Sequence, residues 1–180
     1  MRPISIILGL AAATTACGAS VQLSIGGVDP DTAAETLIET ELSDQVGLGP
    51  LSAECDPITD AEVGSEFDCT GTSADGQVVR FVAVIDREDH IDVNTINVFR
   101  PDVLDELERA AERTLADQVG RQVPEGSIDC GEANRIFGPD LTMVCDFHAP
   151  DSDDVYDITF TLADLDSGDF SFEVADAPRP

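Results

Sequence analysis

Apolar residues recur at every fourth position in two separate stretches of the chain, which is the spacing of one face of an α-helix. The two series are Ala34, Ile38, Leu42 and Val46, and then Leu107, Ala111, Leu115 and Val119. Each series follows a start that combines Pro with Asp, and each is followed by a glycine suited to a left-handed helix cap. The pattern predicts amphipathic helices over residues 30–47 and 102–119.

A strand-like pattern follows each predicted helix. Residues 155–162 alternate between apolar and polar side chains, and residues 78–85 form a stretch of strand length that is apolar except for Arg80. A polar turn and a last strand follow each run, at 86–89 and 91–98 in the first half and at 164–168 and 170–174 in the second. We therefore expect about four short antiparallel strands after each helix.

The two halves are related in sequence as well as in pattern. The segment Leu-Ser-Asp-Gln-Val-Gly at 42–47 returns as Leu-Ala-Asp-Gln-Val-Gly at 115–120. We predict an α+β fold of two tandem copies of one small domain, at residues 29–99 and 100–176. Each copy would be one helix packed on a roughly four-stranded antiparallel meander. Domains of this size bury little apolar surface, so they need a further source of stability.

Cysteines supply that source. Cys55 and Cys69 lie in the first predicted copy, Cys130 and Cys145 lie in the second, and Cys17 precedes both. Four cysteines admit three pairings, and the repeat favours one disulfide within each copy over pairing between the copies. Each disulfide would close a loop of about 15 residues, worth about 3 kcal/mol in the chain-entropy model.

The start of the chain has the pattern of an export signal. Met1 and Arg2 precede an apolar run over residues 4–13 that is too short to span a bilayer. The next residues, Thr14-Thr15-Ala16-Cys17-Gly18, resemble a bacterial lipobox, in which small residues precede a Cys that receives diacylglycerol and becomes the new N-terminus. Thr14 stands where Leu is usual, and the alternative is cleavage by an ordinary signal peptidase after Ala13 or Ala16.

The odd number of cysteines favours the lipid. If four cysteines form disulfides in an oxidising compartment, only Cys17 lacks a partner, and lipidation accounts for it. We predict a lipoprotein signal peptide over residues 1–17, lipid attachment at Cys17 and a flexible tether over residues 18–28. The expected location is the extracytoplasmic face of the cell membrane, with the exported chain held there by its lipid.

The order of features along the chain resembles the domain of unknown function 4333, a family common in envelope lipoproteins of actinobacteria. These features are a lipobox, a helix, a Cys, a Gly, a second Cys and a meander. The residues that carry the likeness are Cys55, Gly64, Phe67 and Cys69 in the first copy, and Cys130, Gly138 and Cys145 in the second. The resemblance implies tandem copies of that domain and an envelope location. It implies no catalytic residues, because the family has no established activity.

Charge restricts the partners. The chain carries 37 acidic and 9 basic residues, a formal net charge of -28, and every basic residue is Arg. Such a surface repels nucleic acid, so we expect no nucleic-acid partner. Adaptation to salt or compositional bias is the favoured explanation of the acidity, and a cation-binding or wall-associating role is the alternative.

Catalytic and metal-binding patterns are missing from the sequence. His90 and His148 fall at non-equivalent places in the two copies, so they do not form a repeated site. The acidic run at 164–169 begins like a calcium loop but has Ala175 where the loop needs Glu, and we interpret it as a hairpin turn. The cysteine spacing lacks a C-x-x-C knuckle for zinc. We predict no catalytic residue, no metal and no cofactor.

These patterns favour a membrane-anchored, non-catalytic binding or interaction module whose partner is a protein, a peptide or a wall component. Tandem copies would raise avidity, and an exposed edge strand of either meander would suit an extended peptide. The alternatives are an inhibitor of another exported enzyme and an envelope hydrolase that uses a carboxylate pair.

Overall fold

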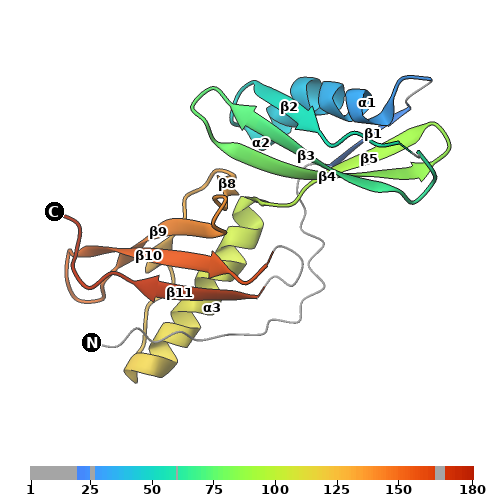
Figure 1. Ribbon diagram of the computed structural model, residues 1–180. Helices are drawn as coiled ribbons and strands as arrows, with labels where there is room; N and C mark the ends of the chain where they lie inside the picture. The colour runs from blue at the N-terminus through green and yellow to red at the C-terminus, as the bar shows by residue number, and fades with distance from the viewer. Residues whose placement is uncertain (1–19, 25–26, 60, 165–168) are drawn as a thin grey trace. The chain divides into compact units, whose positions relative to one another are not determined.

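The computed structural model describes residues 20–24, 27–59, 61–164 and 169–180 (Figure 1). The chain divides between Phe99 and Arg100 into two compact units. We call the described residues up to Phe99 the N-terminal unit and Arg100–Pro180 the C-terminal unit. Each unit has a helical segment, an antiparallel sheet and one disulfide, so the fold class is α+β.

The helical segment of the N-terminal unit runs without a break from Pro30 to Val46, although it is not one regular helix. It consists of α1 (Pro30–Leu37), the π-helical turn η1 (Ile38–Leu42) and α2 (Ser43–Val46). Hydroxyl groups in this segment donate to the backbone carbonyl four residues earlier, from Thr36, Thr40 and Ser43. Such bonds compete with the helix's own N–H groups and distort it. The single helix expected over residues 30–47 is therefore divided.

The apolar face predicted for this segment is the buried one. The four predicted side chains, Ala34, Ile38, Leu42 and Val46, are at most 2% exposed, and the neighbouring Leu37 is 1% exposed. The segment packs closely against the sheet at Gly71, where a Cβ would lie 3.0 Å from a Phe81 carbon and 3.4 Å from an Ile38 carbon. The absence of a side chain at Gly71 thus permits the approach of helix and sheet.

The sheet of the N-terminal unit has five antiparallel strands in the order β1-β5-β4-β3-β2. Their bounds are β1 Ser20–Ser24, β2 Leu51–Cys55, β3 Glu66–Ser73, β4 Val78–Arg87 and β5 His90–Thr95, and β6 Val98–Phe99 follows. Buried and exposed side chains alternate along β3, because one face of the sheet packs under the helical segment. The core of this unit lies between these two layers.

Strand β1 corrects one expectation. We expected a flexible tether over residues 18–28, but Ser20–Ser24 pairs antiparallel with β5, with Val21 opposite Val93 and Leu23 opposite Ile91. The segment Ser-Val-Gln-Leu-Ser alternates polar and apolar residues with the period of a strand. It therefore extends the meander by one strand.

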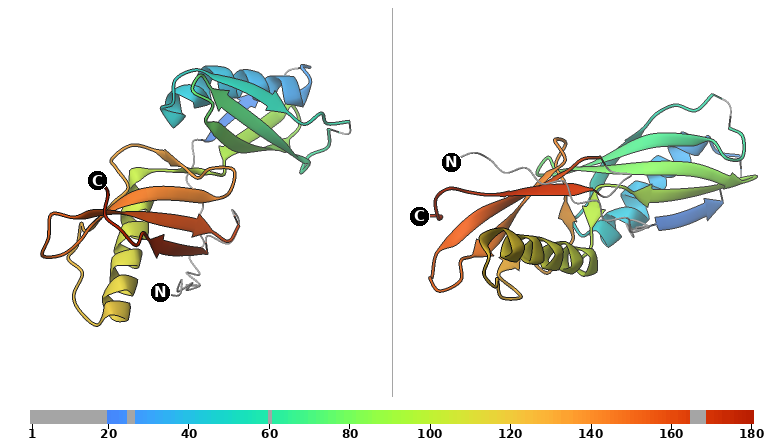
Figure 2. Two further views of the ribbon diagram at one scale, coloured as in Figure 1. Left: turned by 60° about the vertical axis from the view of Figure 1, so that its left-hand side comes forward. Right: turned by 90° about the horizontal axis from the view of Figure 1, so that it is seen from below.

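The C-terminal unit has one long helix, α3 (Pro101–Val119), which lies across one face of its sheet (Figure 2). The strands are β7 Ile128–Asp129, β8 Arg135–Ile136, β9 Thr142–His148, β10 Val155–Leu162 and β11 Phe170–Val174. Four of them form an antiparallel sheet in the order β11-β10-β9-β7. The expected turn at 164–168 falls between β10 and β11, although residues 165–168 lie outside the described part of the chain.

The buried face of α3 matches the predicted one except at its end. Leu107, Ala111 and Leu115 are buried, whereas Val119 is 55% exposed. Val119 is in the last turn, next to Gly120, whose φ of 66° places it in the left-handed cap that ends the helix. The apolar series therefore extends one position beyond the part of the helix that contacts the sheet.

Both disulfides link the short first strand of a meander to its neighbour. Cys55 and Cys69 are directly opposite each other in β2 and β3, with their Cα atoms 4.0 Å apart. Cys130 follows β7 immediately and bonds to Cys145 in β9, with a Cα–Cα distance of 4.5 Å. The pairing within each half predicted from the repeat is the one observed.

The predicted signal peptide and Cys17 lie outside the described residues. None of the helices in the described part of the chain is long and apolar enough to cross a membrane.

Candidate functional site

Two glutamates one helical turn apart on α3 reach the edge of the sheet. A side-chain oxygen of Glu112 accepts the N–H of Ile128 at 3.1 Å, and one of Glu108 accepts the N–H of Cys130 at 2.7 Å. Backbone groups in a strand point alternately to either side, so these two N–H groups face the same way, out of the sheet's edge. The carboxylates therefore occupy the positions that another strand would need.

The N-terminal unit contains the same arrangement. Glu39 accepts the N–H of Ala53 at 3.0 Å, and Glu35 accepts the N–H of Cys55 at 3.1 Å. As in the C-terminal unit, the two bonds go to the first disulfide cysteine and to the residue two places before it. An uncovered sheet edge is a template for unwanted strand pairing. In both units the helix closes this edge with a pair of glutamates.

The two glutamate pairs differ in burial. Glu112 is 5% exposed and its donor Ile128 is 1% exposed, so this bond lies away from water. Glu39 is exposed and Ala53 is half-buried. Since an unmade hydrogen bond costs more in the interior than at the surface, the bond of Glu112 has the larger structural effect.

Glu108 is half-buried beside other carboxylates. Burial raises the pKa of Glu108 above its ordinary value, and the negative charges of Asp105, Asp129 and Glu112 act in the same direction. The hydrogen bond from Cys130 opposes the shift. A carboxyl group with a raised pKa inside a cleft is a candidate for acid–base chemistry. Here, however, the Glu108 carboxylate already accepts the backbone N–H of Cys130, the residue that follows β7.

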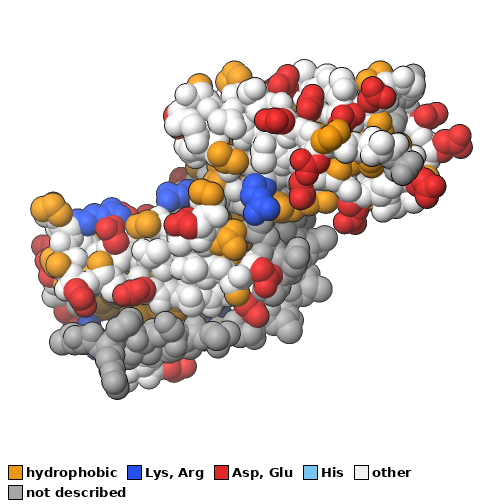
Figure 3. Space-filling view, in the orientation of Figure 1, with side chains coloured by type: hydrophobic (Ala, Val, Ile, Leu, Met, Phe, Trp, Pro, Cys, Tyr) orange, Lys and Arg blue, Asp and Glu red, His pale blue; other side chains and the backbone are white. Residues whose placement is uncertain are grey.

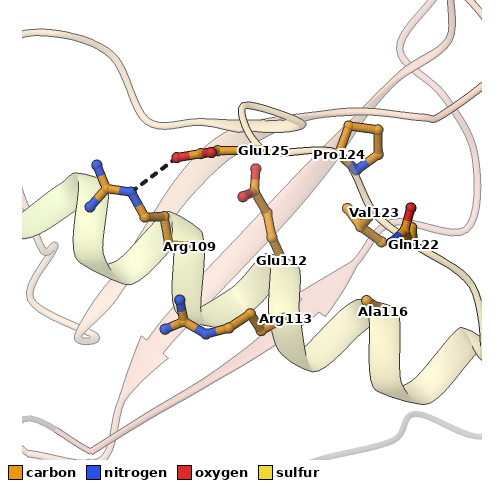
Figure 4. Close-up of a pocket in the computed structure, with 8 residues that line it drawn as sticks. All are labelled: Arg109, Glu112, Arg113, Ala116, Gln122, Val123, Pro124 and Glu125. Carbon is orange, nitrogen blue, oxygen red and sulfur yellow. Dashed lines mark ion pairs between the residues drawn. The ribbon is translucent and has the colours of Figure 1, made fainter.

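A pocket lies beside this pair, between α3 and the segment that leaves it. It has a volume of about 520 Å³ and is lined by Arg109, Glu112, Arg113, Ala116, Gln122, Val123, Pro124 and Glu125. Figure 4 shows Glu112 pointing between the helix and residues 122–125, and Arg109 reaching Glu125. The Arg109–Glu125 ion pair spans 3.4 Å and crosses the mouth of the pocket. The pocket thus combines two arginines with two carboxylates.

The sequence patterns did not predict this pocket. Arg109 and Arg113 are one helical turn apart, which places them on the same side of α3. That spacing was the available signal. The opposite wall, residues 122–125, has no regular pattern, and only the folded chain shows that it returns along the helix.

A second hollow of about 430 Å³ lies in the N-terminal unit, at the segment after Cys55. It is lined by Asp56, Pro57, Ile58, Thr59, Glu66, Phe67, Asp68 and Val82. Its walls are the 56–59 loop and strands β3 and β4, with no helical residue among them. Because the two hollows occupy different places in their units, they do not form a repeated ligand site.

The predicted disulfide residues are bonded in pairs, and the two histidines belong to different units. His90 begins β5 of the N-terminal unit, and His148 ends β9 of the C-terminal unit. The described residues contain no group of three or more His, Cys, Asp or Glu side chains placed to hold a metal ion. Cys17, the predicted lipid site, lies outside the described residues.

Acidic side chains are spread over the visible surface of each unit (Figure 3). Several arginines are paired with them, including Arg100 with Asp102 at 2.7 Å and Arg179 with Asp146 at 2.8 Å. The bond from Arg100 lowers the pKa of Asp102. Such exposed pairs contribute little to stability, so the surface acts mainly through its overall negative charge.

Comparison with known families finds a match in the first part of the chain. Residues 12–89 match the family of domains of unknown function DUF4333. The DUF4333 match includes the helical segment, the Cys55–Cys69 disulfide and strands β1 to β4, and it ends one residue before β5. It contains the Glu35 and Glu39 pair. The chain has no match among the curated proteins or the solved structures that were compared.

Proposed function

We propose that this chain is an exported lipoprotein held at the extracytoplasmic face of the cell membrane by lipid on Cys17. Its two units are tandem copies of the DUF4333 scaffold, a helix on an antiparallel meander. They bind a protein, a peptide or a wall component without catalysing a reaction.

The paired glutamates are the main observation that supports two tandem copies of one scaffold. The same spacing along the chain separates Glu35 from Glu108 and Glu39 from Glu112. Each pair bonds the N–H groups of a disulfide cysteine and of the residue two places earlier. Agreement of helix position, edge bonding and disulfide position is best explained by duplication of one domain. The C-terminal half of this likeness lies outside residues 12–89, the part of the chain that the family match covers.

The same glutamates support a binding role over catalysis. A carboxylate that works as a general acid or base needs access to the substrate proton. Glu112, which lines the larger pocket, instead accepts a bond from Ile128, and Glu108 accepts one from Cys130. These carboxylates therefore serve to hold helix and sheet together.

The position of β1 limits the distance between the proposed lipid anchor and the N-terminal unit. Only Gly18 and Ala19 separate Cys17 from the first residue of β1. Even a fully extended chain spans at most about 3.6 Å per residue, so the anchor would hold the start of β1 within about 11 Å of the lipid-bearing residue. The N-terminal unit would then lie at the membrane surface. Because the negative chain is repelled by anionic lipids, the lipid rather than charge would hold it there.

Intact-mass analysis of the chain from its native membrane tests the anchor. We expect a mature chain that begins at Cys17, carries diacylglycerol and lacks the four hydrogens removed by two disulfides. Cys17→Ala should release the chain from the membrane fraction, whereas Thr14→Leu, which restores the usual lipobox residue, should leave it anchored. An unlipidated chain cleaved after Ala13 or Ala16 would contradict the anchor.

In-cell crosslinking followed by affinity purification tests the binding role. The anchored chain should recover one specific exported protein or wall fragment, and recovery should fall when a unit is unfolded by loss of its disulfide. If crosslinking yields no specific partner and the purified chain is inert toward wall fragments, the binding role is wrong.

A further inference from the structure

The C-terminal unit closes one edge of its sheet, and none of the described strands lies beside the other edge. Glu108 and Glu112 cover the β7 edge, as described above. At the opposite end of the sheet, β11 pairs with β10 alone among the strands that the structure describes. In the N-terminal unit the strand in the same place, β5, pairs with β4 on one side and with β1 on the other.

The backbone of β11 offers hydrogen-bonding groups on this side. Ala163 donates its N–H to Asp169, and Ala175 donates to Asp157, so residues at odd positions in this strand bond to β10. Strand backbone groups alternate in direction, and the N–H and C=O groups of Phe170, Phe172 and Val174 therefore point away from β10. They form the row that an added strand would use.

The side chains of β11 are also less covered than those of β5. Phe172 lies opposite the fully buried Phe160, with ring centroids 5.9 Å apart, and Val174 lies opposite Ile158. Both Phe172 and Val174 are nevertheless half-exposed. Ile91 and Val93 of β5, which have β1 beside them, are 0% exposed. The edge of the C-terminal unit thus leaves apolar surface that one further strand would cover.

The negative charge near β11 indicates which kind of added strand would bind there. The run 169–176 contains Asp169, Glu173 and Asp176 and no basic residue. A second copy of this chain would bring a formal charge of -28 to this edge, and like charges repel. A segment with Arg or Lys opposite Glu173 would instead gain a favourable cross-strand pair.

We propose, as a development of the binding role inferred above, that the free edge of β11 binds an extended, basic segment of another exported protein as a fifth strand. The β1–β5 register supplies the pattern: apolar residues Val21 and Leu23 stand opposite inward-facing residues, and Gln22 stands opposite Asp92. Transferred to β11, this register gives an occupant with apolar residues opposite Phe172 and Val174 and a base between them.

A peptide titration tests the inference. The probe is a capped peptide with the core Val-Arg-Val-Thr-Val, added to the full chain purified in detergent, with binding measured by calorimetry and amide chemical shifts. We expect saturable binding with shifts centred on β11. A matched peptide with Glu in place of Arg should bind at least about threefold more weakly, within the range of a single cross-strand charge pair.

Backbone variants separate strand addition from other contacts. Val174→Pro removes an N–H that points away from β10, so it should keep the β10–β11 ladder and weaken peptide binding at least about tenfold. Val174→Thr keeps that N–H and the β-branched shape, and should stay within about threefold of the unsubstituted chain. As a measurement independent of protein folding, methylating the peptide nitrogens that face β11 should abolish binding, whereas methylating the alternate nitrogens should not.

Three results would overturn the inference: no binding of the basic peptide, binding that is unaffected by Val174→Pro and by peptide methylation, or dimerisation of the chain alone that Val174→Pro removes. The last result would assign the edge to a second copy. In each case the in-cell crosslinking experiment decides separately whether the chain has a partner, so failure of the β11 site is distinguishable from failure of the binding role.

Discussion

The two units cover one edge of their sheets in the same way and differ at the other edge. Both close the edge beside the disulfide with a pair of helical glutamates. At the opposite edge, β1 covers β5 in the N-terminal unit, whereas no described strand covers β11 in the C-terminal unit. The chain itself explains this difference: β6 ends at Phe99 and α3 begins at Pro101, so no residues are left before the second helix to form a covering strand.

This contrast separates the features that the common scaffold requires from a feature that is present in one unit. The glutamate pair and the disulfide occur in both units, which indicates that they stabilise the basic helix-on-meander arrangement. Among the described strands, a covering strand occurs in the N-terminal unit, and no such strand lies beside β11 in the C-terminal unit. A feature that varies between two similar units in this way is a reasonable place for function.

Removal of the disulfides is the largest expected perturbation of the comparison. Each closes a similar loop, with sequence separations of 14 and 15 residues. We expect Cys55→Ser with Cys69→Ser, and Cys130→Ser with Cys145→Ser, each to lower the free energy of unfolding of its own unit by about 3 kcal/mol. Urea unfolding followed by NMR signals from each unit measures this. A loss in only one unit would mean that the two disulfides do not have equivalent roles.

Truncation of the deeper glutamate is expected to have the next largest effect. Glu112→Ala leaves the buried N–H of Ile128 without its acceptor, so the C-terminal unit should lose about 1–3 kcal/mol. The equivalent change Glu39→Ala exposes the N–H of Ala53 to water and should cost less than about 1 kcal/mol in the N-terminal unit. The two variants change the charge equally and are each other's control. Equal losses would show that burial does not distinguish the two pairs.

A smaller effect is expected from neutralising Glu108. Because its pKa is raised in the folded chain, folding favours the protonated form. Its contribution to stability is therefore fully present below the ordinary pKa and is lost as the pH rises through the raised value. Glu108→Gln keeps an oxygen for the N–H of Cys130 without the charge, so at pH 7 it should be within about 0.5 kcal/mol of the unsubstituted chain or more stable.

The pH dependence provides the specific readout for this variant. Between the ordinary Glu pKa of 4.5 and neutral pH, the stability of Glu108→Gln should fall less steeply than that of the unsubstituted chain. Glu106→Gln, on the exposed side of the same helix, removes an equal charge and serves as the control. If both variants show the same pH profile, the charge of Glu108 has no special environment.

Local periodicity accounts for the features that the sequence predicted well. The four-residue spacing located both buried helix faces, and the repeat assigned Cys55 to Cys69 and Cys130 to Cys145, because the copies had to be treated alike. The Cys and Gly spacing indicated a resemblance to the DUF4333 family, and the family match covers residues 12–89, which include most of the first predicted copy. These features depend on residues near one another in the chain.

Features that depend on distant partners were missed. Strand β1 has only five residues, and its partner β5 is far along the chain, so its alternation resembled a polar tether. The glutamate pairs sit at helical spacing on both helices, but charged residues beside an apolar face usually point to solvent. Only the folded chain brings the N–H groups of β2 and of the β7 end to these side chains. The exposure of Val119 likewise depends on where the sheet ends.

Amide hydrogen exchange by NMR tests the difference between the two edges most directly. The N–H groups of Ile91 and Val93 face β1, because the N–H of Ile96 bonds to Arg80 and the direction alternates along β5. We expect these amides, and those of Ser171 and Glu173 that face β10, to exchange at least about a hundredfold more slowly than the amides of Phe172 and Val174. Equal protection of all six amides in the purified chain would show that the edge of β11 is not free and would contradict the account.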